Sequence, residues 1–190
     1  MQHDIRRWVG FLWLAFLVLW TIGALVQKRA VRRDSLTSRV LQLALGATAY
    51  FLLASPRLSH GFLATPFVPE NILFSFLGLG LTIIGFAFAI WGRVVLGGNW
   101  SAAVTVKKDH ELVRNGPYAL VRHPIYTGAL LALLGTAVVF RESRGLSAFA
   151  VALLALRLKS QREERFMTEE FGAEYKDYEK RVKALVPFVW

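Results

Sequence analysis

The stretch GPYALVRHPIYTGALLALLG, residues 116–135, begins as a polar loop and ends as an apolar helix. Its second half is almost wholly apolar, yet Arg122, His123 and Pro124 stand where the apolar run begins. A charge next to the hydrocarbon layer costs free energy unless it is paired, and such charges mark candidate functional sites. The stretch therefore indicates a membrane-inserted helix with a candidate site at its mouth.

Apolar runs of this kind recur along the chain, which is 55% hydrophobic. A helix needs roughly 20 apolar residues to cross a bilayer, and fewer when it forms a tight hairpin. The first run is too long for the core of a signal peptide and is expected to stay in the protein. The runs predict an all-α, polytopic membrane protein with about five transmembrane helices. They are residues 8–26, 40–54, 72–91, 125–140 and 145–158, and only residues 141–144 separate the last two, which predicts a helical hairpin.

The basic residues divide unevenly between the two sides that five spans create. Of the 23 lysines and arginines, 18 lie in residues 27–39, 92–124 and 157–190, and only 5 lie on the other side. Cytoplasmic loops carry the excess of basic residues. We therefore expect an extracytoplasmic amino terminus and a cytoplasmic carboxy terminus, with the polar segments 107–124 and 157–183 together on the cytoplasmic face. Most of these basic residues are expected to bind anionic lipid headgroups.

The composition also excludes some kinds of site. There is no cysteine, which excludes disulfides, thiolate zinc sites and a cysteine nucleophile. We expect no metal and no nucleic-acid partner, and the sequence gives no indication of an oligomeric state.

The backbone around the mouth favours an anion. Residues 115–117 form a turn motif. The following proline pushes His123 out of helical geometry, and Pro124 suits the first turn of a new helix. The N–H groups of residues 125–127 are then expected to lack helical partners. Together with the helix dipole, Arg122 and His123 they favour a carboxylate or phosphate. The alternative is that Arg122 and His123 merely anchor a helix end among lipid headgroups.

A second polar segment follows the last apolar run. Apolar and aromatic residues recur at helical spacing between positions 167 and 182, which predicts a cytoplasmic amphipathic helix that Gly172 breaks into two. Glu163 lies at the membrane-proximal head of this stripe, one turn after Lys159. They either pair with each other as a simple salt bridge or take part in chemistry.

Taken together, these motifs resemble the isoprenylcysteine carboxyl methyltransferase family. The resemblance covers residues 95–190, and membrane phospholipid methyltransferases share much of the pattern. Each motif is weak alone, but their order and spacing are specific in combination. The motifs are His110-x-Leu112-Val113, Gly116-x-Tyr118, Arg122-His123-Pro124-x-Tyr126-x-Gly128, and Glu163-Glu164 before Phe171-Gly172-x-Glu174-Tyr175.

The resemblance implies a membrane-embedded helical enzyme that transfers a methyl group from S-adenosylmethionine to the carboxylate of a prenylated cysteine, leaving S-adenosylhomocysteine. The length of 190 residues predicts a single integral membrane domain over residues 1–190, with amino-terminal spans in 1–91. The resemblance implies that residues 92–190 form a cofactor-binding methyltransferase core. The cofactor-binding residues it implies are His110, Glu111, Leu112, Val113, Tyr118, His123, Pro124, Ile125, Tyr126 and Glu163.

The acceptor is less closely defined, because the family commonly has an arginine where this chain has Lys159. Lysine keeps the charge but loses the planar fork that grips a carboxylate. The candidate catalytic residues are Lys159, to hold the acceptor carboxylate, Arg122, as a further donor at the mouth, and Glu164. An amine acceptor requires a base, for which Glu164 or Glu163 is the candidate. The alternatives are methylation of a phospholipid amine or a small lipophilic thiol, and, more remotely, a non-enzymatic membrane protein or a reductase-like relative.

Overall fold

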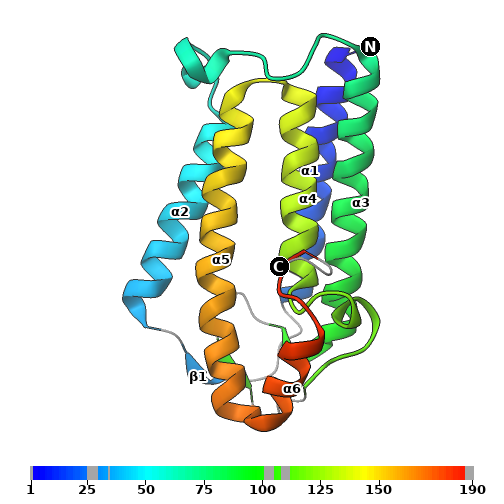
Figure 1. Cartoon of the computed structure of the whole chain (residues 1–190). Coiled ribbons are helices and arrows are strands. Elements are labelled where there is room, and N and C mark those ends of the chain that lie inside the picture. The colour runs from blue at the N-terminus through cyan, green and yellow to red at the C-terminus, as the bar shows by residue number, and fades with distance from the viewer. Residues whose placement is uncertain (1, 25–29, 34, 101–104, 108–111, 187–190) are drawn as a thin grey trace.

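Five long helices form the body of the molecule in a computed structural model that describes residues 2–24, 30–33, 35–100, 105–107 and 112–186 (Figure 1). They are α1 (Gln2–Ala24), α2 (Leu36–Ala54), α3 (Ile72–Leu96), α4 (Pro124–Phe140) and α5 (Ser143–Phe171). Helices α1, α2 and α3 are long and apolar enough to cross a membrane, and α4 is a shorter apolar helix. The helical membrane fold is confirmed, while the count of five spans stays a prediction.

The short elements gather at the two ends of the bundle. The 3-10 helices η1 (Pro56–Leu58) and η2 (Gly61–Ala64) lie with the amino terminus and the α4–α5 turn at one end (Figure 1). At the other end lie η3 (Gly97–Asn99), η4 (Gly116–Ala119) and α6 (Ala173–Arg181). The described parts of the two polar segments therefore share one end, as the sequence predicts.

A small antiparallel sheet was not predicted. Strand β1 (Ala30–Arg33) pairs with β2 (Thr105–Lys107), with Ala30 opposite Lys107 and Arg33 opposite Thr105. It joins the connection after α1 to the connection after α3 at the polar end.

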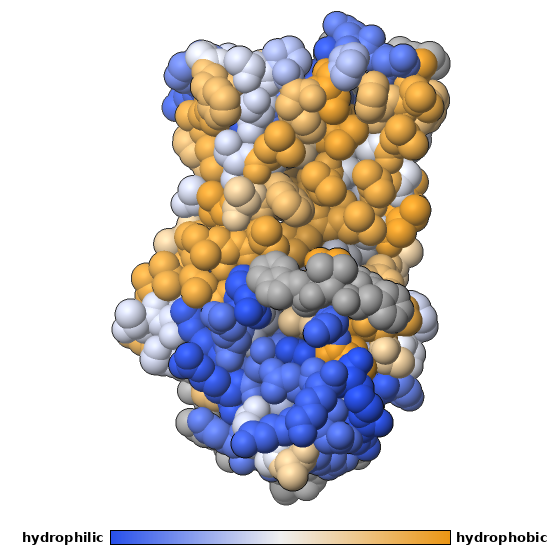
Figure 2. All heavy atoms as spheres, in the orientation of Figure 1, coloured by the Kyte–Doolittle hydropathy of each residue, from blue (hydrophilic) through white to orange (hydrophobic). Residues whose placement is uncertain are grey.

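The surface agrees with a membrane position. On the face that Figure 2 shows, apolar residues cover the middle of the bundle, and hydrophilic residues cover the end that carries α6. Large apolar side chains such as Trp8, Phe11, Leu43 and Leu73 are more than half exposed on α1, α2 and α3. These side chains would be unfavourable in water and are favourable against lipid.

Glycines bring α3 and α4 into backbone contact along an antiparallel seam. A Cβ atom added to Gly85 would lie 2.4 Å from the Ala132 amide nitrogen and 2.5 Å from the Gly128 carbonyl oxygen. Two turns along the seam, a Cβ atom added to Gly78 would lie 2.6 Å from the Gly135 carbonyl oxygen. Helices in lipid associate through such close packing of small residues, because the hydrophobic effect does not drive them together.

Local signals at the element ends were predicted correctly. Pro124 begins α4, and His123 before it has a non-helical backbone (φ −125°, ψ 62°). The α4–α5 hairpin turns at Arg141, whose φ is 68°. Gly172, with φ 53°, separates α5 from α6.

The seam gives a test of stability. Gly85→Ala forces α3 and α4 apart, and such overpacking costs about 1–3 kcal/mol, which lowers the thermal unfolding midpoint in detergent by about 2–12 °C. Gly46→Ala on α2 is the matched control, because nothing lies within 4 Å of its added Cβ. Equal midpoints for the two variants would contradict the seam.

Candidate functional site

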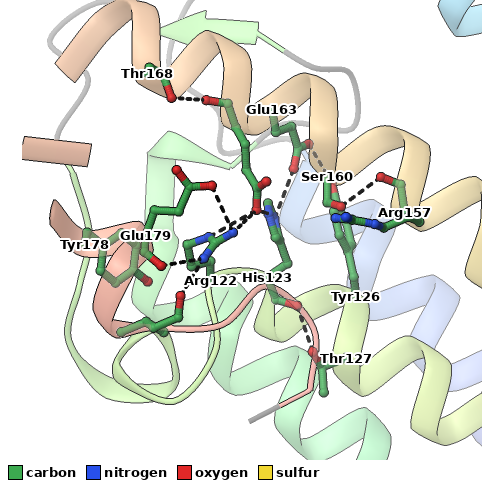
Figure 3. Close-up of polar contacts among 12 residues, drawn as sticks. Arg122, His123, Tyr126, Thr127, Arg157, Ser160, Glu163, Thr168, Tyr178 and Glu179 are labelled. Carbon is green, nitrogen blue, oxygen red and sulfur yellow. Dashed lines mark hydrogen bonds and ion pairs between the residues drawn. The ribbon is translucent and has the colours of Figure 1, made fainter. Parts of the chain in front are cut away.

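The mouth of α4 and the polar end of α5 meet in a cluster of charged and aromatic side chains (Figure 3). Arg122 and His123 come from the loop before α4, and Tyr126 from its first turn. Lys159, Glu163 and Glu164 come from the last turns of α5. Residues about forty positions apart in sequence are thus brought within hydrogen-bonding distance of one another.

His123 lies between two carboxylates. Its Nε2 is 3.0 Å from Glu164 Oε1, and its Nδ1 is 3.5 Å from Glu163 Oε2. The His123 side chain is only 9% exposed. Burial lowers the pKa of His123, but the hydrogen bonds and negative charges of Glu163 and Glu164 outweigh burial and raise it overall. A protonated ring, which donates from both nitrogens, satisfies both carboxylates.

Glu163 is shared by three groups. The Tyr126 hydroxyl donates to Glu163 Oε1 at 2.5 Å, and His123 faces the other oxygen. Burial raises the pKa of Glu163, but His123, the Lys159 charge and Tyr126 together lower it below its ordinary value. Glu163 is therefore a carboxylate at neutral pH, held in place from two sides.

Tyr126 presents its ring to two other groups of the cluster. His123 stacks parallel to the ring, with centroids 5.3 Å apart and planes 5° apart. The Lys159 ammonium lies 5.2 Å from the ring centroid. An aromatic face at this distance attracts a cation. The cluster thus contains a cation-accepting ring next to an ionised carboxylate.

Arg122 and Glu164 hold each other. Arg122 donates to Glu164 Oε1 from Nε at 3.1 Å and from Nη2 at 2.7 Å, and its side chain is 8% exposed. Its Nη1 donates to the carbonyls of Val182 at 2.5 Å and Glu179 at 3.1 Å. Arg122 thereby connects α5 to the chain around the end of α6. Direct catalytic roles for Arg122 and Glu164 stay predictions.

The anions at the start of α4 are the carboxylates of the protein's own Glu163 and Glu164. The sequence predicted free N–H groups at residues 125–127, but the amides of Tyr126 and Thr127 both donate to the His123 carbonyl at 3.0 Å. The expectation of three free amides was therefore wrong. The donors of Arg122 and His123 point to Glu163 and Glu164 instead, so the described side chains already fill the place proposed for a small anion.

The remaining predicted residues lie beside this cluster. Tyr118 is buried, and its hydroxyl donates to the Gly92 carbonyl at 3.3 Å. Pro124 and Ile125 pack against Gly92 at the end of α3. Leu112 and Val113 are half-buried in the loop, and His110 and Glu111 lie outside the described residues.

Sequence reasoning missed a segment of the site, residues 182–186, which we name the carboxy-terminal strap. Its carbonyls at Lys183 and Ala184 accept from the Arg122 and His123 amides at 2.8 and 3.0 Å. The Leu185 carbonyl accepts from the Thr127 hydroxyl at 2.7 Å. The apolar residues after the charged α6 sequence were the available signal. The α3–α4 seam was also missed, and the seven-residue spacing of its glycines was the signal that could have found it.

The family comparison matches the part of the chain that builds this site. The sequence model of a family described as the isoprenylcysteine carboxyl methyltransferase (ICMT) family matches residues 78–171. These residues contain most of α3 and all of α4 and α5, with the charged cluster that α4 and α5 form. The strap and α6 lie outside the matched residues.

Curated relatives include one whose name agrees with that match and one that is named for metal resistance. A protein of Oryza sativa subsp. indica named "Probable protein-S-isoprenylcysteine O-methyltransferase" is 33% identical over 129 residues, which are 65% of this chain and 66% of that protein. The "Cobalt-zinc-cadmium resistance protein CzcN" of Cupriavidus metallidurans is 33% identical over 112 residues, 57% of this chain and 49% of that protein. The chain thus spans between about half and two thirds of the length of these relatives.

A solved structure has the same fold. The eukaryotic intramembrane Ras methyltransferase ICMT, solved without a monobody, superposes with a TM-score of 0.54 at 24% identity. The match covers 84% of this chain and 55% of that chain.

The charged cluster predicts a pH dependence of stability. Because the pKa of His123 is raised, its stabilisation is complete below its ordinary value of about 6.5 and is lost as pH rises through the higher folded value. We expect the thermal unfolding midpoint in detergent to fall over that alkaline interval and His123→Asn to remove the decline. His60→Asn, at an exposed histidine, is the control. An unchanged profile for His123→Asn would refute this assignment.

Proposed function

We propose that this chain, which belongs to the isoprenylcysteine carboxyl methyltransferase family, is an integral membrane methyltransferase that uses S-adenosylmethionine to methylate the carboxylate of an isoprenylcysteine-like lipophilic acceptor. One observation carries the proposal: Lys159, Tyr126 and Glu163 form a cation, an aromatic ring and a carboxylate in contact. They lie where the apolar length of α4 and α5 passes into the polar end of the molecule.

The residues present fit the cofactor. S-adenosylmethionine carries a sulfonium and an ammonium, and a cation of that kind favours an aromatic face and a carboxylate. Tyr126 already accepts the Lys159 ammonium over its ring, and Glu163 is ionised. Glu163, Tyr126 and His123 would hold the cofactor, with Tyr118 and the loop at residues 110–113 beside them. The cofactor supplies an electrophilic methyl group.

The chain has to bind and align the acceptor, with little proton chemistry of its own. A carboxylate is ionised at neutral pH and needs no general base. The Lys159 ammonium would hold this carboxylate at the membrane boundary and orient one oxygen toward the methyl carbon. Such alignment, together with exclusion of water by the packed α4–α5 end, accounts for large rate enhancements.

A phospholipid amine acceptor would need a base, for which Glu164 or Glu163 is the candidate, and the pKa of Glu163 is lowered. Burial raises the pKa of Glu164, but His123 and Arg122 outweigh burial and lower it. A carboxylate that accepts three hydrogen bonds on one oxygen is a weak base. The cluster therefore favours the carboxylate acceptor over the amine.

The function is tested by incubating the detergent-purified protein with radiolabelled S-adenosylmethionine and a panel of acceptors. The panel contains prenylcysteines, phosphatidylethanolamine and lipophilic thiols, and the products are identified after extraction. A base-labile methyl ester on a prenylcysteine supports the proposal. Label found only on amine nitrogen or thiol sulfur would overturn it.

Substitution of Lys159 tests how the acceptor is held. A hydrogen bond to a charged group is worth about 1.5–3 kcal/mol, so Lys159→Ala should lower kcat/KM by about ten- to a hundredfold without weakening cofactor binding. Lys159→Arg should keep activity, because guanidinium grips a carboxylate with two parallel bonds. Arg165→Ala, an exposed cation on the same helix, is the control. A Lys159→Ala variant as active as the parent would mean that Lys159 holds no carboxylate.

We also propose that the site faces the cytoplasm. The end that carries the site belongs to the side with 18 of the 23 basic residues, and cytoplasmic segments carry that excess. A reporter enzyme fused after Trp190 should be active in the cytoplasm. Activity of a fusion on the opposite side of the membrane would reverse the proposed orientation.

A further inference from the structure

Lys159 lies at a cation-binding place that two other residues form. Its ammonium is 5.2 Å from the centroid of the Tyr126 ring. Its charge also attracts Glu163, which lies one helical turn later on α5. The Tyr126 hydroxyl donates to Glu163 Oε1 at 2.5 Å, which joins the ring and the carboxylate as the Tyr126–Glu163 pair. The protein's own lysine therefore supplies a cation to this pair.

Lys159 is held less tightly than two neighbouring cations of the cluster. The ring nitrogens of His123 face Glu164 and Glu163 at 3.0 and 3.5 Å. Arg122 donates to Glu164 at 2.7 Å, and the side chains of His123 and Arg122 are 9% and 8% exposed. Lys159 is only half-buried, and it reaches the ring through a flexible four-carbon stem. It can therefore withdraw by rotating its own side chain, without movement of the backbone.

The proposed function assigns a second cation to the same pair. The sulfonium of S-adenosylmethionine favours an aromatic face beside a carboxylate, as the Lys159 ammonium does. The His123 imidazole already stacks parallel to the Tyr126 ring, with planes 5° apart, and faces the other oxygen of Glu163. Two positive charges close together repel each other, most strongly where water is excluded. The ammonium and the sulfonium therefore exclude each other at the Tyr126–Glu163 pair.

We infer that Lys159 is an internal competitor of the cofactor, because its ammonium lies on the Tyr126–Glu163 pair and must withdraw when the sulfonium of S-adenosylmethionine binds there. The inference rests on the proposed function and adds an autoinhibitory contact to its cofactor site. Withdrawal makes the ammonium available to the acceptor carboxylate, the task that the proposed function gives it. The product S-adenosylhomocysteine has no sulfonium, so Lys159 can return to the ring after methyl transfer.

The test compares two cofactor analogues that differ in charge at one position. S-adenosylhomocysteine has an uncharged sulfur, and sinefungin carries a protonated primary amine where the cofactor carries its sulfonium. The dissociation constant of each is measured by titration calorimetry in detergent, without an acceptor. The decisive quantity is the ratio of the Kd for S-adenosylhomocysteine to the Kd for sinefungin. Because the two analogues share their adenosine and amino-acid groups, this ratio cancels changes elsewhere in the cofactor site.

Lys159→Met keeps most of the stem and removes the charge. It should raise the ratio by about two- to thirtyfold, the range of a cation–aromatic contact, because sinefungin no longer displaces an ammonium. Lys159→Arg should keep the ratio near that of the parent, since a guanidinium also lies over aromatic rings. Arg165→Ala is the matched control, because it removes an exposed charge from the same helix, and it should leave the ratio unchanged.

A second comparison separates competition for the ring from repulsion at a distance. Lys159→Met is repeated in a Tyr126→Leu background, where neither cation has an aromatic face. The substitution should then change the ratio by less than it does in the parent. An equal change in both backgrounds would mean that Lys159 acts through its charge alone, which would overturn the inference.

Failure of the inference is distinguishable from failure of the proposed function. If the parent binds both analogues and Lys159→Met leaves the ratio unchanged, Lys159 does not compete with the cofactor, and the proposed function is unaffected. If the parent binds neither analogue, the proposed function fails, and the inference about Lys159 fails with it.

Discussion

Backbone contact between α3 and α4 is the constraint on which the site depends. No side chain fits where Gly85 meets Gly128, so the two helices have one separation and one register. That register brings the first turn of α4 against Gly92 near the end of α3, where Pro124 and Ile125 pack. His123 immediately precedes this turn. The place of the imidazole is therefore set by helix packing several turns deeper in the bundle.

Electrostatic pairing then connects the packed helices to α5 and α6. Buried charges are tolerated when each has partners, and removal of one partner leaves the other uncompensated. His123 pairs with both glutamates. Arg122 pairs with Glu164 and donates hydrogen bonds to the carbonyls of Glu179 and Val182 around the end of α6. Because Glu163 and Glu164 are adjacent on α5, one held by Tyr126 and the other by Arg122, the cluster fixes the rotation of that helix about its axis. Groups held in this way need little rearrangement when a substrate binds.

The sequence predicted those features that local geometry determines. Pro124 begins a helix because of its fixed φ and missing N–H, and Gly172 ends one because it accepts a positive φ. The partners of the mouth residues could not be predicted, since they come from α5, about forty residues later. An anion site was expected from the start of α4 together with Arg122. The His123 carbonyl accepts from two of the helix amides, and glutamates of α5 accept from the side chains of Arg122 and His123. The strap was missed for the same reason, because only tertiary contacts give Leu185 its place.

The position of the cluster bears on how one site would bind the two unlike molecules of the proposed reaction and release both. In the proposed reaction the acceptor is a hydrophobic anion and the cofactor is a polar cation, so both find complementary surroundings only where the apolar surface meets the polar end. Transfer of the methyl group forms an O–C bond, breaks an S–C bond and removes the carboxylate and sulfonium charges together. Lys159 and the Tyr126–Glu163 pair would then lose the charges that they are proposed to bind. The same contacts that align the reactants would hold the ester and the thioether less tightly, which favours turnover over product retention.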